Sequence, residues 1–537
     1  MVEVIGKRGL IIAILIAVVL LASSLAVYVI YLGPDSAGMS FIRIDGNKDL
    51  TEDNGVTSGN GTADNPFVIE DLVLSLSQGI SVANTDAYLV IRDVRLDNTT
   101  ELMPAIDIAN AKNLALVNVT IDESWDGIKM TNSRDCEVRG CRISMARAGS
   151  GLTLLQCLNV TAERNVIRTS GWGLFGAIEV VESHECVCSN NTISETSAGI
   201  HVLDSEGCEF HANDVNTTGW GMNLELSQNS TLKANSFARL GVQLQGDSVD
   251  DYSTHTITND NLLAGKPIVY RNNEDGVTIS NVELGEIIIA NCRSVQIVNV
   301  QIIDTSAGVY MYHSSDASIE NVSVSGRGID YLASFTYGIE AEYCSNISLI
   351  SNRVHDMGHG IRCQGTDVTL SRNYISVEVT CTSLELWRAT ISNNTFDGQE
   401  GIVLIWGNNI LIANNTFVNC SAISIDLGTV SDVVVANNTL TESRIIARLS
   451  SVNNALFYHN EFTNCSEGVI LDGYVNCSWD SGYPGGGNYW SNYTGLDAFS
   501  GSGQDIPGSD GIGDTPYPVS ESLGIWDNYP LMSPIST

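Results

Sequence analysis

The chain has 537 residues, 43% of them hydrophobic, so it is long enough to bury a large core. Only 26 Lys and Arg residues stand against 62 Asp and Glu residues, a formal net charge of -36. This charge repels nucleic acid phosphates and anionic lipid headgroups, so the composition excludes nucleic-acid binding. It suits cations, water or neutral sugars as partners, although solubility alone also explains an acidic surface.

Residues 9–32 form an uncharged apolar run that is long enough to cross a hydrocarbon layer of about 30 Å as a helix. Lys7 and Arg8 precede this run, so the positive-inside rule predicts a cytoplasmic tail at 1–8 and a transmembrane anchor at 9–32. A cleaved signal peptide is the alternative, but its apolar core is only about 7 to 15 residues long. We therefore expect a membrane-anchored cell-surface protein with its N-terminus inside and its C-terminus outside.

A strand-like pattern closes again and again on an Asn, one further residue and then an aliphatic residue or Phe, mostly 21 to 26 residues apart. A second pattern lies between these strand ends, as at Gly79, Gly199 and Gly360. It consists of Gly, an aliphatic residue and then alternating apolar and polar residues. Two short strands per repeat bury their apolar residues only when successive coils stack. The closing residues are Leu96, Ile121, Ile143, Ile167, Ile193, Val215, Phe237, Leu262, Leu284, Ile302, Val324, Val354, Ile375, Phe396, Phe417, Leu440 and Phe462.

This repeat predicts an all-β fold, a single-stranded right-handed parallel β-helix of about 17 rungs over residues 73–475. Stacked strands lie about 4.8 Å apart, which gives a rod with one continuous core roughly 80 Å long. A solenoid must cover its terminal edges. We expect residues 33–72 to form the N-terminal cap and residues 476–537, rich in Gly, Asp and aromatic residues, to form the C-terminal capping segment.

Asn tolerates left-handed backbone geometry and hydrogen-bonds locally in tight turns, which explains its place at the strand ends. The same residues create many glycosylation sequons, often as NNT at Asn190, Asn393 and Asn414. Turn geometry alone supplies the Asn and strand propensity supplies the Thr. We expect about half of the sequons to be real acceptors, which predicts a glycoprotein.

Thirteen cysteines occur without the spacing of a zinc site. Cys186 and Cys208 occupy equivalent places in successive repeats, and stacked strands lie within reach of a disulfide. The alternative, which we favour, is a column of buried free thiols that act as small hydrophobic side chains.

Three parts of the chain carry a family resemblance. The first is GTADNPFVIEDL at 61–72, and the second is NLLAGKPIVYRNN at 261–273. The third consists of GGGNYW, DGIGDTPYPV and DNYPLM, all after residue 484. Together with the repeat, they resemble the NosD-like right-handed β-helix proteins of archaeal cell surfaces. The resemblance implies a β-helix of the carbohydrate-binding and sugar-hydrolase type. The family takes its name from a periplasmic protein tied to copper delivery, but the eight His and nine Met here form no cluster of copper ligands.

The best local candidates for catalysis are His355, Asp356, His359 and Arg362 in the segment HDMGHGIR. This segment adjoins the longest repeat, 30 residues from Val324 to Val354, whose loop can wall a groove. The loop and the residues after it also contain Arg327, Asp330, Tyr331 and Tyr337.

Segments NTD at 84–86, the acidic pair at 250–251 and GHG at 358–360 match polygalacturonase motifs. They are 166 and 108 residues apart here, whereas two carboxylates that share a glycosidic bond lie within about 10 Å. We therefore expect this match to be chance. The chain also lacks a nucleophile elbow and a P-loop pattern.

Aromatic and acidic residues in loops suggest two kinds of binding site. Trp172 and Trp220, both in the pattern GWG, are candidates for stacking on sugar rings, as are Trp387 and Trp406. Capping of a sheet edge would explain the first two equally well. Asp505, Asp510 and Asp514 alternate with glycines as calcium ligands do, although solvated turns have the same composition.

The leading functional hypothesis is a non-catalytic surface protein that binds polysaccharide or cell-envelope glycans, or serves as a rigid spacer. One alternative is a polysaccharide lyase, hydrolase or epimerase of the β-helix type. A second alternative is a NosD-like copper-accessory protein. Calcium is the one cofactor that the sequence suggests.

Overall fold

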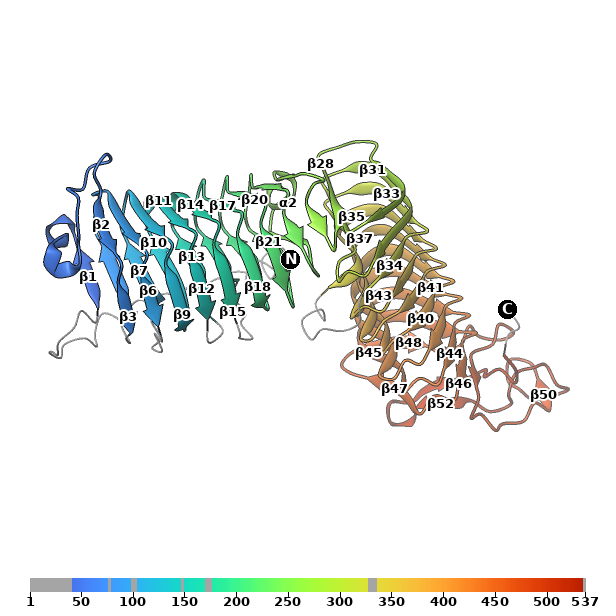
Figure 1. Ribbon diagram of the computed structural model, residues 1–537. Coiled ribbons are helices and arrows are strands. Elements are labelled where there is room, and N and C mark those ends of the chain that lie inside the picture. The colour runs from blue at the N-terminus through green and yellow to red at the C-terminus, as the bar shows by residue number, and fades with distance from the viewer. Residues whose placement is uncertain are drawn as a thin grey trace.

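The computed structural model describes residues 41–75, 79–97, 104–145, 149–169, 176–326 and 336–534. Over these residues the chain is an all-β parallel solenoid of about 17 turns, in agreement with the predicted fold class. The solenoid bends once (Figure 1). We call the two halves the N-terminal arm, residues 42–263, and the C-terminal arm, residues 266–490.

The N-terminal arm consists of three parallel sheets, and each coil adds one strand to each sheet. The first sheet contains β1 (Ile42–Asp45), β4 (Ile80–Ala83), β7 (Pro104–Ala109), β10 (Asp126–Thr131), β13 (Leu152–Leu155), β16 (Ile178–Val181), β19 (Ile200–Leu203), β22 (Met222–Glu225) and β25 (Val242–Gln245). The second sheet contains β2 (Phe67–Glu70), β5 (Leu89–Arg92), β8 (Leu114–Val117), β11 (Arg134–Arg139), β14 (Leu158–Glu163), β17 (Val187–Ser189), β20 (Glu209–His211), β23 (Thr231–Lys233) and β26 (Thr256–Ile257). The third position is taken by β3 (Val73–Ser75), β6 (Arg95–Asp97), β9 (Thr120–Ser124), β12 (Arg142–Met145), β15 (Val166–Thr169), β18 (Thr192–Thr196), β21 (Asp214–Thr217), β24 (Ser236–Phe237) and β27 (Leu262–Leu263).

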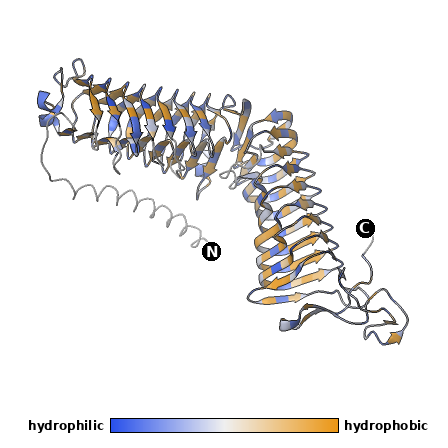
Figure 2. Ribbon diagram, turned by 60° about the horizontal axis from the view of Figure 1, so that its bottom comes forward, coloured by the Kyte–Doolittle hydropathy of each residue, from blue (hydrophilic) through white to orange (hydrophobic). Residues whose placement is uncertain are grey.

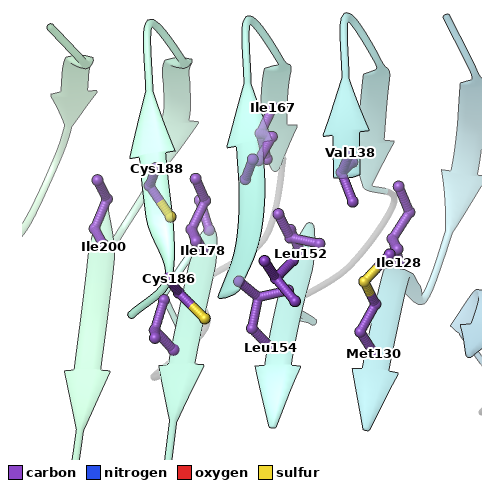
Figure 3. Packing of buried hydrophobic residues seen from close by; sticks show 14 of the residues in the cluster. Ile128, Met130, Val138, Leu152, Leu154, Ile167, Ile178, Cys186, Cys188 and Ile200 are labelled. Carbon is purple, nitrogen blue, oxygen red and sulfur yellow. The ribbon is translucent and has the colours of Figure 1, made fainter. Parts of the chain in front are cut away.

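Equivalent residues of successive coils lie over one another. Leu152 pairs in register with Ile178, and Ile178 with Ile200. Their side chains point from successive strands into a single interior (Figure 3). Hydrophobic and hydrophilic residues alternate along the strands of both arms (Figure 2). The stacked aliphatic residues therefore fill a tubular core. Burying one such side chain stabilises the fold by roughly 1.5 to 3 kcal/mol.

Two ladders of buried Asn side chains run along the axis at the turn before the third strand of each coil. In a typical step, Asn394 donates to Asn415 Oδ1 from its Nδ2 at 2.9 Å and from its backbone N at 3.0 Å. The residue before each ladder Asn turns the chain, and at Asn414 it does so with a φ of 57°. In NNT, therefore, the first Asn forms the turn and the second forms the ladder. The ladders contain Asn165, Asn191, Asn213, Asn235 and Asn261, and then Asn352, Asn373, Asn394, Asn415, Asn438, Asn460 and Asn488.

The C-terminal arm continues the stack with longer strands that pass through two positions of the coil. The first position is taken by β28 (Lys266–Asn272), β30 (Glu286–Ala290), β32 (Val309–Tyr312), β35 (Tyr337–Ile350), β37 (His359–Ser371), β39 (Thr380–Ser392), β41 (Glu400–Ala413), β43 (Ile423–Ala436), β45 (Ile445–Tyr458) and β47 (Glu467–Leu471). The strands β35, β37, β39, β41, β43 and β45 also form the second position. In the earlier coils this position is taken by β29 (Thr278–Leu284), β31 (Arg293–Ile303) and β33 (Ser315–Glu320), and in the last coil by β48 (Val475–Ser478). The third position contains β34 (Ser323–Ser325), β36 (Arg353–His355), β38 (Tyr374–Ser376), β40 (Thr395–Asp397), β42 (Thr416–Val418), β44 (Thr439–Thr441), β46 (Glu461–Thr463) and β49 (Tyr489–Trp490).

The bend arises because β30 and β32 bury both of their faces. Ile287 and Ile289 point into the core of the C-terminal arm, whereas Ile288 and Tyr310 belong to the core of the N-terminal arm. The open end of the N-terminal arm thus packs on the outer face of the first strands of the C-terminal arm. The predicted single continuous core is wrong, since the described hydrophobic residues form two cores that meet at an angle.

Polar contacts fasten this junction. Glu286 Oε2 of β30 accepts the backbone N–H of Val242, at the free edge of the first sheet, at 2.9 Å. Tyr270 donates its hydroxyl to the backbone oxygen of Tyr252, beside the short helix α2 (Asp250–Ser253), at 2.7 Å. Each contact satisfies a backbone group that the change of direction leaves without a strand partner.

The C-terminal segment covers the last coil through a buried carboxylate. Asp527 Oδ2 accepts hydrogen bonds from the backbone N–H of Asn488, the last ladder residue, at 2.7 Å and from Trp490 Nε1 at 2.9 Å. The motifs GGGNYW and DNYPLM are therefore the two halves of one contact. Around it lie β50 (Phe499–Ser500), β51 (Ile506–Pro507), β52 (Tyr517–Ser520), β53 (Ile525–Asp527) and a 3₁₀ turn at Glu521–Leu523; the N-terminal end carries 3₁₀ turns at Asn47–Asp49 and Glu52–Asn54.

The thirteen cysteines are free thiols, and eleven of them are buried, including Cys186 and Cys208. The predicted anchor at 9–32 lies outside the described residues. Among the residues that are described, no helix is long and apolar enough to cross a membrane.

Replacing a ladder residue tests the contribution of the Asn ladders. Asn415→Ala leaves the buried amides of Asn394 and the backbone oxygen of Ile391 without their present partner. We expect a loss of about 2 to 4 kcal/mol in unfolding free energy, because buried polar groups lose their hydrogen bonds. The matched control is Asn414→Gly, which keeps the left-handed turn and should cost less than about 1 kcal/mol. Equal losses of stability in urea for the two variants would contradict the ladder's role.

The junction carboxyl should make stability depend on pH. Burial raises the pKa of Glu286 to about 8, against the lowering effect of the hydrogen bond from Val242. Between about pH 4.5 and 8 the folded chain holds a proton that the unfolded chain releases, so stability falls as pH rises, on the order of 1 kcal/mol per unit. Glu286→Gln keeps an acceptor oxygen but does not ionise. Its melting temperature should therefore fall less than that of the wild type across this range, and parallel curves would refute this account.

Candidate functional site

The inner corner of the bend is bordered by one face of each arm. The last strand of the first sheet, with the residues just before it, contacts β30 and the segment before β32, which come after β28 in the C-terminal arm. Val242 donates its N–H to Glu286, and the backbone oxygen of Arg239 accepts the N–H of Ser306. The third position ends against β28, where Leu263 pairs with Lys266. The first sheet therefore lies on the side toward which the C-terminal arm extends. Its outer face and the outer faces of β35 and β37, beyond the docked strand β32, are the two walls of the corner.

An arginine bound to two carboxyl groups lies on the C-terminal wall. Glu340 and Glu342 extend from β35, and Arg362 extends from the next strand, β37. Arg362 Nη1 lies 3.3 Å from Glu340 Oε1, and Nη2 lies 2.7 Å from Glu342 Oε1. The two glutamate side chains are only 14% and 12% exposed. Glu340 pairs in register with Tyr310, whose ring is in the core of the N-terminal arm, so this cluster lies beside the junction.

Burial controls how these carboxyl groups ionise. Burial first, and then the charge of Glu342, raise the pKa of Glu340 to about 8. Burial also raises the pKa of Glu342, although Arg362 opposes the rise. At neutral pH the pair therefore holds a proton on Glu340, while the remaining negative charge is matched by Arg362.

Aromatic side chains surround this charged cluster. The Tyr337 ring lies 5.0 Å from the His359 ring, and the Arg362 guanidinium carbon lies 5.9 Å from the centre of the Tyr337 ring. Next to Glu342, the Tyr343 ring stacks on His313 with 4.7 Å between the centroids. The C-terminal wall thus combines ring faces with hydrogen-bonding groups.

The opposite wall carries a histidine between two glutamates. His201 Nδ1 lies 2.9 Å from Glu179 and Nε2 lies 3.1 Å from Glu225, all on the outer face of the first sheet. Burial lowers the pKa of His201, but the hydrogen bonds of its ring nitrogens to both carboxylates outweigh this effect and raise the pKa to about 10. The Trp220 ring meets His201 edge-on, with 5.7 Å between the centroids. Beside them Asn223 Oδ1 is buried and has no hydrogen-bond partner among the described residues.

The predicted site residues divide among several places. His359 and Arg362 lie in the corner. His355 and Asp356 bond to each other at 2.6 Å at the end of β36, in the third position of the coil. Trp220 lies on the N-terminal wall, and Trp172 falls outside the described residues.

Residues of the predicted calcium loop engage in hydrogen bonds within the loop. The carboxylate of Asp514 accepts the backbone N–H groups of Ala498 and Phe499, each at 3.0 Å, and Asp510 Oδ1 accepts that of Ile512. Asp505 is exposed beside them. Calcium binding by Asp505, Asp510 and Asp514 stays a prediction.

The segments that match polygalacturonase motifs lie far apart on the solenoid. Asn84 follows β4 in the second coil, Asp250 and Asp251 are in α2, and Gly358 precedes β37. Asp251 is buried, and its Oδ2 accepts the Ser248 N–H at 2.9 Å. These residues do not form one site.

Motif analysis named Arg362 and Trp220 but missed the glutamates and the histidine that bind around them, because these clusters have no local sequence signature. Their signal is the repeat: Glu179 and His201 are 22 residues apart, as are Glu340 and Arg362. Such residues pair directly in register across neighbouring strands. Charged residues one repeat apart at outward positions would have indicated contact.

The carboxyl geometry favours binding over hydrolysis. Glu340 and Glu342 contact one another and the same arginine. A glycosidase instead holds its two carboxyls about 5 Å or more apart, on either side of the bond that breaks. The two carboxyls bind one guanidinium, and the cluster offers donors and acceptors for hydroxyl groups.

Comparison of the chain with protein-family models finds a match. A family model described as "Periplasmic copper-binding protein (NosD)" matches residues 52–268 and 259–495. None of the curated proteins matches the chain.

Solved structures show distant similarity. The surface adhesin PfbA of Streptococcus pneumoniae is 10% identical, with 78% of this chain and 85% of that chain covered and a TM-score of 0.28. A PL6 alginate lyase in complex with a trisaccharide is 11% identical, with 76% and 86% covered and a TM-score of 0.24. A mutant of the periplasmic alginate epimerase AlgG is 11% identical, with 75% and 84% covered and a TM-score of 0.22.

The described residues do not fit a copper centre. No group of three or more His, Cys, Asp or Glu side chains among them is placed to hold a metal ion. Copper prefers thiolate, thioether and imidazole ligands. Burial raises the pKa of the Cys141 and Cys157 thiols to about 11, and Met130 and Met222 are enclosed in the core.

Removing the arginine of the corner should lower the free energy of unfolding, because its carboxyl partners stay buried without a cation. In Arg362→Gln the two buried glutamates lose their cation, so we expect a loss on the order of 2 kcal/mol at pH 8. The loss should be smaller at pH 5, where both carboxyls can take up protons. Arg388→Gln breaks an exposed pair with Asp367 and is the matched control, with less than about 1 kcal/mol lost at either pH. Thermal melts at both pH values measure the difference, and a loss independent of pH would contradict it.

Proposed function

Since the chain belongs to the NosD family, we propose that it is an extracytoplasmic β-solenoid that binds carbohydrate of the cell envelope or its surroundings without transforming it. The family description names a periplasmic protein, which supports a place outside the cytoplasm. The apolar run at 9–32 supports attachment to the membrane with the solenoid outside.

One observation carries the proposal: the bend brings two clusters of charged and aromatic side chains to the walls of one corner. Glu179, His201 and Trp220 lie on one wall, and Glu340 and Arg362 lie on the other. Sugars are bound by hydrogen bonds from charged and amide groups and by stacking on aromatic rings. A corner open on one side suits a polymer that continues beyond the site.

A polysaccharide-active enzyme is the second candidate, and Glu340 favours it. A carboxyl group with a pKa near 8 is protonated at neutral pH, which is the state of a general acid. The direct contact between Glu340 and Glu342 weighs against this role.

Trp220→Ala should weaken binding in a glycan array probed with the full-length protein in detergent. Loss of an aromatic contact of about 0.5 to 1.5 kcal/mol corresponds to a reduction of about 2- to 12-fold in affinity. Trp526→Ala, which removes a 40% exposed ring from the C-terminal cap, is the matched control and should bind as the wild type does. No binding above background by the wild type would refute the proposal.

The enzymatic candidate is separated by its products. Incubation with neutral and uronic-acid polymers should release neither unsaturated nor reducing ends under the binding hypothesis. Release that is abolished in Glu340→Gln would establish the enzyme instead. Tight copper binding in a titration of the purified protein would support the accessory role that the family name describes.

A further inference from the structure

Three large aromatic side chains are exposed close together on the C-terminal arm, along a line that starts on the corner wall and leads away from it. Tyr343, Trp387 and Trp406 expose 43%, 37% and 44% of their surface. They lie where β35, β39 and β41 pass from the first position of the coil to the second. We call this surface the aromatic strip.

Strand register arranges the strip in two neighbouring rows. In the first row Gln364 pairs with Glu385, and Glu385 with Trp406. In the second row Thr366 pairs with Trp387, and Trp387 with Asn408. The rows are separated by a single column of residues, so Trp387 and Trp406 are diagonal neighbours on adjacent coils.

Extra residues at both ends of the strip present its aromatic rings. The register of β35 shifts between Ala341 and Cys344, so that Glu342 and Tyr343 together face Gln364. The register between β39 and β41 shifts in the same way, and Ile405 is the added residue before Trp406. Such bulges re-aim side chains and occur beside functional sites.

Polar groups that suit sugar hydroxyls lie between the rings. Gln364 Nε2 donates to Glu385 Oε2 at 3.1 Å, which leaves the other carboxylate oxygen of this half-exposed residue available. Asn408 donates to Ser431 at 2.6 Å and keeps its carbonyl oxygen. Rings with amide and carboxylate groups between them are the chemistry that sugar chains require.

The strip continues into the inner corner. Tyr343 stacks on His313, and the adjacent Glu342 binds Arg362 of the corner cluster. From Tyr343 to Trp406 the strip crosses three coil intervals, about 14 Å at about 4.8 Å each, a length that several sugar units span.

Charge selects among polysaccharides. Glu385 lies along the strip, Glu342 and Arg362 offset one another beside Tyr343, and Arg388 is engaged by Asp367 at 2.6 Å. The chain as a whole carries a formal charge of -36. A polyuronate would meet like charge along its length, whereas the ammonium groups of an amino sugar would meet carboxylates.

We propose that the aromatic strip is a binding track for amino-sugar polymers. It binds them with higher affinity than neutral sugar polymers, and with much higher affinity than polyuronates. This inference rests on the proposed carbohydrate-binding function. The rings stack on the sugar faces, and Glu385 binds the amino group.

Titration calorimetry with three hexamers that share one linkage tests the track. The full-length protein in detergent is titrated at low salt and mildly acidic pH with glucosamine, N-acetylglucosamine and mannuronate hexamers. We expect the glucosamine hexamer to bind at least tenfold more tightly than the mannuronate hexamer. Trp387→Ala and Trp406→Ala should each weaken it about 2- to 12-fold. Glu385→Gln should reduce the preference for the amino sugar and leave N-acetylglucosamine binding unchanged.

The outcomes separate this inference from the function on which it rests. Binding that is lost in Trp220→Ala but unchanged in Trp387→Ala and Trp406→Ala would overturn the track and leave the corner as the site. Tightest binding of the mannuronate hexamer would overturn the charge argument. Absence of binding to any hexamer and to the glycan array would overturn both. Trp526→Ala, the control in the C-terminal cap, should change none of the affinities.

Discussion

The whole structure depends on the register in which one coil stacks on the next. Aliphatic residues pay the entropic cost of ordering the chain only if each side chain meets its equivalent in the coils above and below. The Asn ladders hold that register, because each ladder amide oxygen accepts hydrogen bonds from both the side-chain amide and the backbone N–H of the ladder residue one coil earlier. A shift by one residue would turn the aliphatic residues to solvent and break the ladder at the same time.

The same stacking turns single outward residues into rows. A charged or aromatic residue that recurs after one repeat meets its counterpart directly across the strand pair. His201 meets Glu179 in this way, and Arg362 meets Glu340, whereas Glu225 lies diagonally to His201. A solenoid surface is therefore suited to ligands that are themselves repetitive, such as polysaccharides, since its binding groups recur along one axis.

The bend gives the solenoid an inner corner that a single straight stack would lack. Apolar residues on both sides of β30 and β32 allow the open end of one arm to pack on the side of the other. The junction removes an exposed edge, which would otherwise pair with other chains. It also creates the inner corner, where carboxyl groups lose water and their pKa values rise, as at Glu340.

The sequence by itself determined the repeat, the parallel stacking, the buried aliphatic interior and the turn role of Asn, because these follow from local periodicity. It also placed His359 and Arg362 among the candidates. The bend, the Glu179, His201 and Glu225 cluster, and the partners of Arg362 were decided only by the tertiary structure. Periodicity records which residues face inward but not which distant coil an outward residue meets, and Ile288 and Tyr310 acquire a partner only when the arms dock.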